Sequence, residues 1–372
     1  MIYQVLARKY RPQTFSEING QTHIITALKN ALSLNRLHHA YLFSGTRGIG
    51  KTTIARVLAK GLNCKKKITD NPCRKCQHCL DIENGTSIDL IEIDAASQSK
   101  VEDIRNVLDN IQYYPLHCRF KIYLIDEVHM LSRYSFNALL KTLEEPPNHV
   151  KFILATTDPN KLPTTIISRC LHFYLQKLTI NEITKKLQDI VNKEKIKTEL
   201  NSLTLIAKSS DGSMRDALSL TDQAIALGNG KINFIDLKYI LGIIDEKYSL
   251  LIFESLVKGN IKKIMCLLDD IEKNGQLCEN LLIEILSWIH HIAILQILPD
   301  SLPEEKKKYL DILNNLAISV SPSDIQLYYQ IFLLGRKDFY YAPCNRTGIE
   351  MIILKAIAFH PKVTESYKTI QS

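Results

Sequence analysis

Eight consecutive residues early in the chain have the types and spacing that bind a nucleotide phosphate. The segment GTRGIGKT fits the pattern G-x-x-x-x-G-K-[ST] and holds three of the 14 glycines of the chain. Glycines let the backbone turn its N–H groups towards a phosphate, and a helix that follows adds partial positive charge. We expect Lys51 to contact the β- and γ-phosphates and the Thr52 hydroxyl to ligate Mg²⁺. A chance glycine-rich turn is the alternative. The predicted phosphate loop is Gly45, Thr46, Arg47, Gly48, Ile49, Gly50, Lys51 and Thr52.

Two acids and a threonine follow apolar runs that have the pattern of strands. The run KIYLIDE ends in Asp126 and Glu127. Beside a phosphate loop, one acid can hold Mg²⁺ and the other can polarise the attacking water. We assign Asp126 to the metal and Glu127 to the general base; an exposed acidic strand end is the alternative. Thr157 ends the next run, and we assign it to sensing water or phosphate rather than to capping the strand.

Four cysteines have the spacing of a metal site. They form the pattern C-x8-C-x2-C-x2-C, and they are Cys64, Cys73, Cys76 and Cys79. Four thiolates with no open position favour structural zinc. The alternatives are an iron–sulfur cluster, whose usual C-x2-C-x2-C-x3-C-P run is absent, and unmetallated thiols. Because the loop is not expected at the phosphates, loss of one cysteine should leave nucleotide binding largely intact.

The elements that must position these groups alternate between strands and helices. The predicted strands are Ala40–Ser44, Ile88–Ile93, Phe120–Ile125, Val150–Thr156 and Leu171–Tyr174. The predicted helices among them are Thr52–Lys60, Val101–Ile111 and Val128–Leu143. Short β-rich runs separated by helices predict an α/β domain: a parallel sheet with helices on both faces.

Strand patterns stop after Leu178, and the remainder reads as helical. The next predicted helices are Ile180–Ile196, Leu200–Ala207, Arg215–Leu227 and Phe234–Ile240. The expected organisation is an α/β domain over 1–178 with a zinc module at 64–79, a small helical domain over 179–242, an all-helical domain over 243–362, and a polar tail over 363–372.

Composition excludes several classes of protein. The chain has 372 residues, 45% of them hydrophobic and 23% charged, which excludes a largely disordered or fibrous protein. The net charge of +8 weakly favours an anionic partner. The first residues lack the apolar core of a secretory signal, and the apolar stretch 281–298 carries polar residues at near-helical spacing. We therefore expect a cytoplasmic protein without a membrane span.

Two arginines stand in short motifs. Arg169 lies in SRC after a proline-bounded loop, and Arg215 lies in GSMRDAL at the start of a predicted helix. An arginine aimed at a γ-phosphate stabilises charge that develops during phosphoryl transfer. From spacing alone, a surface ion pair is the commoner outcome for each.

Taken together and in order, these motifs resemble a known family. GTRGIGKT, the four-cysteine insertion, IYLIDEVHML, LLKTLEEPP, ATTDPNKLP, SRC and GSMRDALSL are similar to those of the bacterial DNA polymerase III gamma/tau subunits, the AAA+ motors of clamp loaders. The resemblance covers about residues 1–362. It implies an ATPase domain, a lid and a collar, with ATP bound between the first two. It further implies that Arg169 acts in trans on a neighbour's ATP, that Arg215 senses nucleotide in cis, and that Arg11, with Arg8 and Tyr10, lies near the adenine.

The resemblance also implies a function. ATP binding and hydrolysis would drive the loading of a sliding clamp onto primer-template DNA, in a ring with other clamp-loader subunits and copies of the same chain. The chain ends at Ser372, about where the collar ends, so we expect a gamma-like product without the tau-specific domains. No carboxylate cluster for polymerase or exonuclease chemistry is evident. The alternatives are a branch-migration motor, a nucleotide-insensitive scaffold subunit and a P-loop metabolite kinase.

Overall fold

The computed structural model describes residues 4–97, 110–242, 246–273, 278–298 and 303–359. The chain divides into two compact units, Met1–Phe234 and Ile235–Ser372. The predicted helix Val101–Ile111 lies almost wholly outside the described residues. The predicted boundaries at 178 and 242 stay predictions.

A five-stranded sheet organises the first unit. Its strands are β1 (Ala40–Ser44), β2 (Leu90–Asp94), β3 (Lys121–Asp126), β4 (Val150–Thr156) and β5 (Leu171–Tyr174). All neighbours pair in parallel in the order β2-β3-β4-β1-β5. Ser44 lies opposite Thr156, and Asp94 opposite Asp126, so the carboxyl ends of these strands meet at one edge. Side chains that follow β1, β3 and β4 are thereby brought together.

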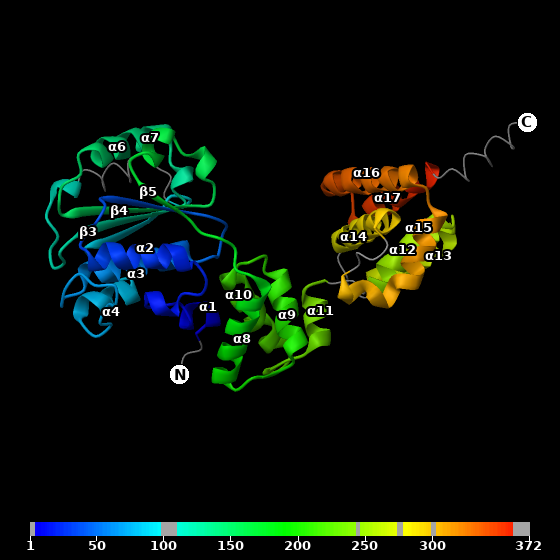
Figure 1. The fold of residues 1–372 in the computed structure, drawn as a ribbon, viewed down its shortest axis with the longest axis horizontal. Coiled ribbons are helices and arrows are strands. Elements are labelled where there is room, and N and C mark those ends of the chain that lie inside the picture. Colours follow the sequence, from blue (N-terminus) through cyan, green and yellow to red (C-terminus); the bar gives the residue numbers. More distant parts are fainter. Residues whose placement is uncertain (1–3, 98–109, 243–245, 274–277, 299–302, 360–372) are drawn as a thin grey trace, which may run out of the picture. The chain divides into compact units, whose positions relative to one another are not determined.

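Helices cover both faces of this sheet, as predicted (Figure 1). Helices α2 (Thr22–Ser33) and α3 (Lys51–Asn63) lie on one face, and α6 (Arg133–Glu144) and α7 (Thr164–Ile167) lie on the other. Successive side chains of β1 alternate between the two cores: Tyr41 and Phe43 join the first, and Ala40 and Leu42 join the second. Burial on both faces explains why the strands read as continuous apolar runs.

The predicted helix Val128–Leu143 is interrupted. A short 3₁₀ turn, η3 (Val128–Met130), precedes α6, which begins at Arg133. The Ser132 side chain accepts a hydrogen bond from the Ser135 backbone N–H at 3.2 Å and so caps α6. A local serine cap thus starts a new helix inside an otherwise helical pattern.

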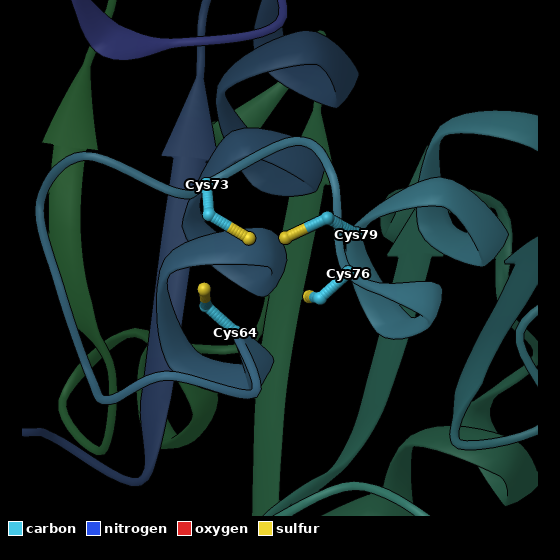
Figure 2. A group of neighbouring side chains, drawn as sticks. All are labelled: Cys64, Cys73, Cys76 and Cys79. Carbon is cyan, nitrogen blue, oxygen red and sulfur yellow. The ribbon is translucent and has the colours of Figure 1, made fainter.

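The four-cysteine segment is an excursion between two helices. Cys64 directly follows α3, and Cys76 precedes α4 (Gln77–Asn84), whose first turn carries Cys79 (Figure 2). The chain returns from α4 to the sheet at β2.

Three helices follow the sheet within the first unit: α8 (Ile180–Glu194), α9 (Leu200–Ser209) and α10 (Met214–Leu227). Helix α8 starts with a capping box, in which Thr179 and Glu182 bond reciprocally. The prediction that no strands follow Leu178 is wrong in one detail. The short strand β6 (Lys197–Thr198) pairs in parallel with β7 (Lys231–Ile232). Strands of two residues are too short to produce an alternating pattern in the sequence.

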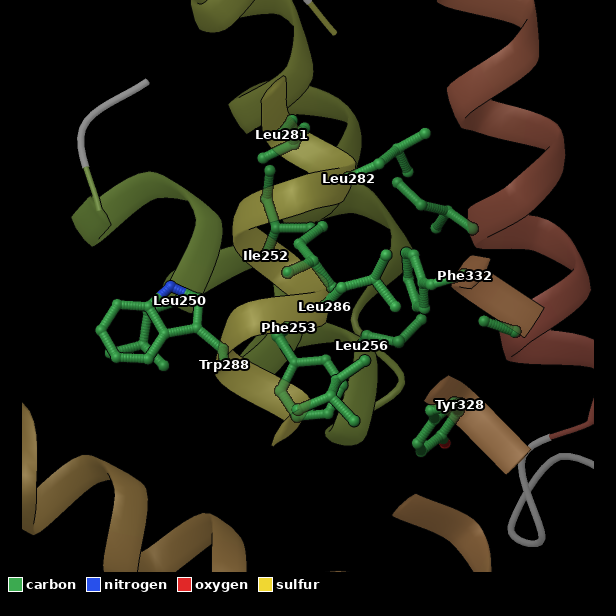
Figure 3. Close-up of a cluster of buried hydrophobic side chains, with 14 of the residues drawn as sticks. Leu250, Ile252, Phe253, Leu256, Leu281, Leu282, Leu286, Trp288, Tyr328 and Phe332 are labelled. Carbon is green, nitrogen blue, oxygen red and sulfur yellow. The ribbon is translucent and has the colours of Figure 1, made fainter. Parts of the chain in front are cut away.

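The second unit is helical and is built around one long apolar helix. Helix α14 (Cys278–Ile297) contributes Trp288 and Leu286 to a core with Phe253, Tyr328 and Phe332 (Figure 3). The Trp288 indole N–H donates to Ser249 Oγ at 2.9 Å inside that core. By length and composition α14 could cross a membrane, but its apolar side chains supply this core. The helices described with it in this core are α12 (Glu246–Val257), α13 (Ile261–Lys273), α15 (Leu310–Ser319), α16 (Pro322–Asp338) and α17 (Asn345–Ala358). Helix α11 (Phe234–Ile240), all of whose residues the structure describes, contributes no side chain to it.

Candidate nucleotide site and metal centre

The predicted phosphate loop connects β1 to α3, the context that its motif requires. Gly45, Gly48 and Gly50 have φ values of 143°, 76° and 106°, which other residues rarely adopt. Space restricts the loop as well: a Cβ on Gly48 would lie 2.0 Å from Ser213 Oγ, at the start of α10. The glycines therefore permit both the turn of the loop and the close approach of α10.

Lys51 is buried within the loop, with only 5% of its surface exposed. Its Nζ donates to the backbone carbonyls of Gly45 at 2.8 Å and Thr46 at 3.0 Å. Burial lowers the pKa of Lys51 below its ordinary value, and the nearby carboxylates of Glu127 and Asp126 offset only part of this effect. The ammonium group is thus held on the loop that would surround a phosphate.

Thr52 and Asp126 bring two oxygen atoms side by side. The Thr52 hydroxyl donates to Asp126 Oδ2 at 2.6 Å, and Asp126 Oδ1 accepts from the Glu127 backbone N–H at 3.0 Å. Hydroxyl and carboxylate oxygens are the ligands that Mg²⁺ prefers. The chemistry of this pair fits the predicted magnesium site.

Glu127 is fixed in an unusual conformation next to Thr157. Its φ of 49° lies in the left-handed region, which is strained for a residue other than glycine. Residues with such strained backbone conformations cluster at functional sites. One carboxylate oxygen, Oε2, accepts from the Thr157 N–H at 3.0 Å and from the Thr157 hydroxyl at 2.8 Å. His129 Nδ1 lies 3.4 Å from the same oxygen and 3.0 Å from Thr156 Oγ1. His129 is not among the residues predicted from the sequence, where its only indication is its place two residues after Glu127.

These groups line one cavity of about 1090 Å³. Arg11 lines it too, donating from Nε to Thr53 Oγ1 at 3.3 Å, and burial lowers the pKa of its guanidinium. Arg215 borders it from α10, where its backbone N–H donates to the Gly48 carbonyl at 3.4 Å. The predicted phosphate, magnesium, base and sensor residues therefore share a cavity large enough for a nucleotide.

Comparisons with known proteins agree along the whole chain. Three family models match: DNA polymerase III, delta subunit, at residues 20–179; the ATPase lid domain of the DNA polymerase III clamp loader subunit, at 182–230; and domain III of the DNA polymerase III subunits gamma and tau, at 233–370. DNA polymerase III subunit tau of Escherichia coli (strain K12) is 55% identical over 98% of this chain, which spans 56% of that protein. DNA polymerase III subunit gamma of Buchnera aphidicola subsp. Acyrthosiphon pisum (strain APS) is 53% identical over 96% of this chain, which spans 99% of that protein.

The chain belongs to the DNA polymerase III gamma/tau family. Its fold is that of an AAA+ ATPase with a lid and a helical third domain, as the sequence predicted.

Arg169 of this gamma/tau chain lies outside the cavity of its own chain. It follows α7, and its guanidinium donates to the Thr165 carbonyl at 2.8 Å and to Glu144 Oε1 at 2.6 Å. One third of its side chain is exposed. Within the single chain it forms the partly exposed ion pair that is the ordinary outcome for an arginine, and its action in trans stays a prediction.

The four cysteines of this gamma/tau chain converge on one point (Figure 2). Their Sγ atoms all lie within 4.8 Å of one another, and Cys64 and Cys79 are buried. Four sulfurs around one zinc ion lie about 3.8 Å apart, so the cluster fits zinc with little movement. Backbone N–H groups of Lys75 and Cys76 lower the pKa of Cys73 to about 6, whereas burial raises the pKa of Cys79. A bound cation would hold all four as thiolates.

We expect the purified chain to contain about one zinc ion, and Cys76→Ser to lose most of it, because a missing ligand opens the closed shell. Metal analysis of both proteins after dialysis measures this. Ser132→Ala, which changes a side chain in a different loop, should keep the metal. A wild-type chain with no zinc and no cluster absorbance would contradict the metal assignment.

Proposed function

We propose that this chain is the ATP-hydrolysing motor of a bacterial clamp loader, in which ATP binding and hydrolysis drive loading of a sliding clamp onto primer-template DNA. The observation that carries the proposal is the hydrogen-bonded Glu127–Thr157 pair in the same cavity as the phosphate-loop residues 46–52. A nucleotide-insensitive scaffold subunit would have no need of these groups together.

Different residues of the chain have different roles in hydrolysis. The phosphate loop and Lys51 bind the β- and γ-phosphates, and Thr52 with Asp126 would hold Mg²⁺, which neutralises phosphate charge. Glu127 accepts a proton from the attacking water. Thr157 holds the Glu127 carboxylate in place, and Arg215 faces the nucleotide from α10.

The relatives' names support the biological setting. They are subunits tau and gamma of DNA polymerase III, and one matching family model describes a clamp-loader lid. We infer that the partners are other clamp-loader subunits, copies of this chain, the clamp and primed DNA, in the cytoplasm. We assign polymerase activity to the holoenzyme and none to this chain.

An ATPase assay of the chain reconstituted with its loader subunits tests the proposal. Turnover should rise when clamp and primed DNA are added together. A turnover rate that does not change with clamp and DNA but rises with a small phosphate acceptor would instead identify a metabolite kinase.

Arg169→Ala should bind ATP normally as an isolated chain and lose about 10–100-fold of the clamp- and DNA-stimulated turnover in the assembled loader. The reason is that a trans arginine contributes mainly as charge builds on the neighbour's γ-phosphate. Equilibrium nucleotide binding and stimulated ATPase, measured separately, check both parts.

Mixed assemblies provide the control for Arg169. A ring that contains both Arg169→Ala and Lys51→Ala chains has some interfaces with both halves of the site intact, so partial turnover should return. Glu144→Gln removes only the ion-pair partner of Arg169 and should keep stimulated turnover. Wild-type turnover by Arg169→Ala would leave the ion-pair interpretation standing.

A further inference from the structure

Residues 5–17, which we name the N-terminal strap, border the nucleotide cavity and are fixed at one end to the lid helices. Arg8, Tyr10, Arg11 and Pro12 line the cavity. The Leu6 backbone N–H donates to Asp222 Oδ2 of α10 at 2.8 Å. Lys9 and the Tyr10 hydroxyl both bond to a carboxylate oxygen of Glu194 on α8.

The other end of the strap is fixed through a buried lysine. Lys60 lies on α3, the helix that follows the phosphate loop, and is 1% exposed. Its Nζ donates to Gln13 Oε1 of the strap and to Glu83 Oε2 of α4, the latter at 2.9 Å. A buried ammonium requires such partners, so α4 and the strap share one cation.

A second link starts inside the cysteine loop itself. Arg74, between the predicted ligands Cys73 and Cys76, has a left-handed φ of 56°. Its guanidinium donates to Glu17 Oε1 at 3.2 Å and lies 3.9 Å from Glu83 Oε1. Glu17 in turn accepts from the Gln13 backbone N–H at 2.8 Å. The path from cysteine loop to strap is therefore continuous.

We propose that the four-cysteine module positions the N-terminal strap and thereby the wall of the nucleotide cavity that the strap residues Arg8, Tyr10, Arg11 and Pro12 line. A metal that closes the loop fixes the backbone of Arg74 and the start of α4, which places Arg74 and Glu83 on the strap. Under this proposal, loss of a cysteine weakens nucleotide binding, which replaces the expectation that binding stays intact. The proposal rests on the nucleotide binding proposed above.

Arg74→Ala tests the proposal with little risk to folding, because Arg74 is exposed. We expect about fivefold weaker ADP binding, an unchanged zinc content, and faster amide hydrogen exchange in residues 5–17. The matched control is Lys75→Ala, which removes the neighbouring exposed cation of the same loop and should change none of the three. Equal ADP affinity in wild type, Arg74→Ala and Lys75→Ala would overturn the proposal.

A double-mutant cycle with Cys76→Ser identifies the route. If the metal acts through Arg74, Arg74→Ala should weaken ADP binding less in the Cys76→Ser background than in wild type. If the losses of ADP binding free energy in the two single variants add up to the loss in the double variant, the metal and Arg74 act independently. That result would overturn the proposed coupling through Arg74. A wild-type chain that binds no ADP would overturn the proposed function itself, whereas tight wild-type binding with unaffected variants overturns only this inference.

Discussion

Glu127→Gln should bind ATP with near-wild-type affinity and hydrolyse it about 10²–10⁴ times more slowly. The amide keeps the size of the side chain and can still bond to Thr157, but it cannot accept a proton from water. Because the phosphate loop, Lys51 and the Thr52–Asp126 pair remain, binding should persist. Equilibrium binding of ATP and single-turnover hydrolysis separate the two effects.

Asp158, which follows Thr157 in the chain, offers a matched control for Glu127. Asp158→Asn also replaces a carboxylate by an amide, in a residue that caps a short turn and lies near Lys161. Its hydrolysis should stay within a few-fold of wild type. If Glu127→Gln lost binding and turnover equally, the general-base assignment would be wrong.

Lys51→Ala should weaken ATP binding by about 100-fold, because charge-assisted contacts to two phosphates disappear. The wild-type ammonium is already buried on the loop carbonyls of Gly45 and Thr46, so little rearrangement is needed to meet a phosphate. Titration with a fluorescent ATP analogue measures the loss.

Two comparisons exclude a folding artefact for Lys51. Thermal unfolding without nucleotide should show whether the loop carbonyls tolerate losing their donor, and Lys161→Ala removes an exposed lysine outside the loop. A stable Lys51→Ala chain with wild-type affinity for ATP would contradict the phosphate assignment.

The parts that the sequence predicted correctly depend on local patterns. The place of the phosphate-loop motif between β1 and α3, the strands of the sheet and the convergence of the four cysteines each follow from a short segment of sequence. The chemical roles of these residues stay predictions. Continuous apolar runs indicated parallel strands, and parallel strands bring Asp126 and Thr157 to one edge. No prediction of distant contacts was needed for these elements.

Contacts between distant segments could not be predicted in the same way. Lys60 reads as an ordinary helix lysine, yet it is buried between Gln13 and Glu83. The pairing of β6 with β7 joins two segments more than 30 residues apart that have no strand pattern. The proposed action of Arg169 in trans involves a neighbouring subunit, which a single chain does not contain, so it stays a proposal.

The contact between Gly48 and Ser213 has a consequence for redesign of this protein. Ser213 is 4% exposed, and its hydroxyl caps α10 by accepting from the Asp216 N–H at 3.2 Å. A side chain at 48 would have to displace that hydroxyl and thereby uncap the helix that carries Arg215. A mutant library that varies position 48 should therefore vary position 213 with it, although the φ of 76° at Gly48 would still strain any added side chain.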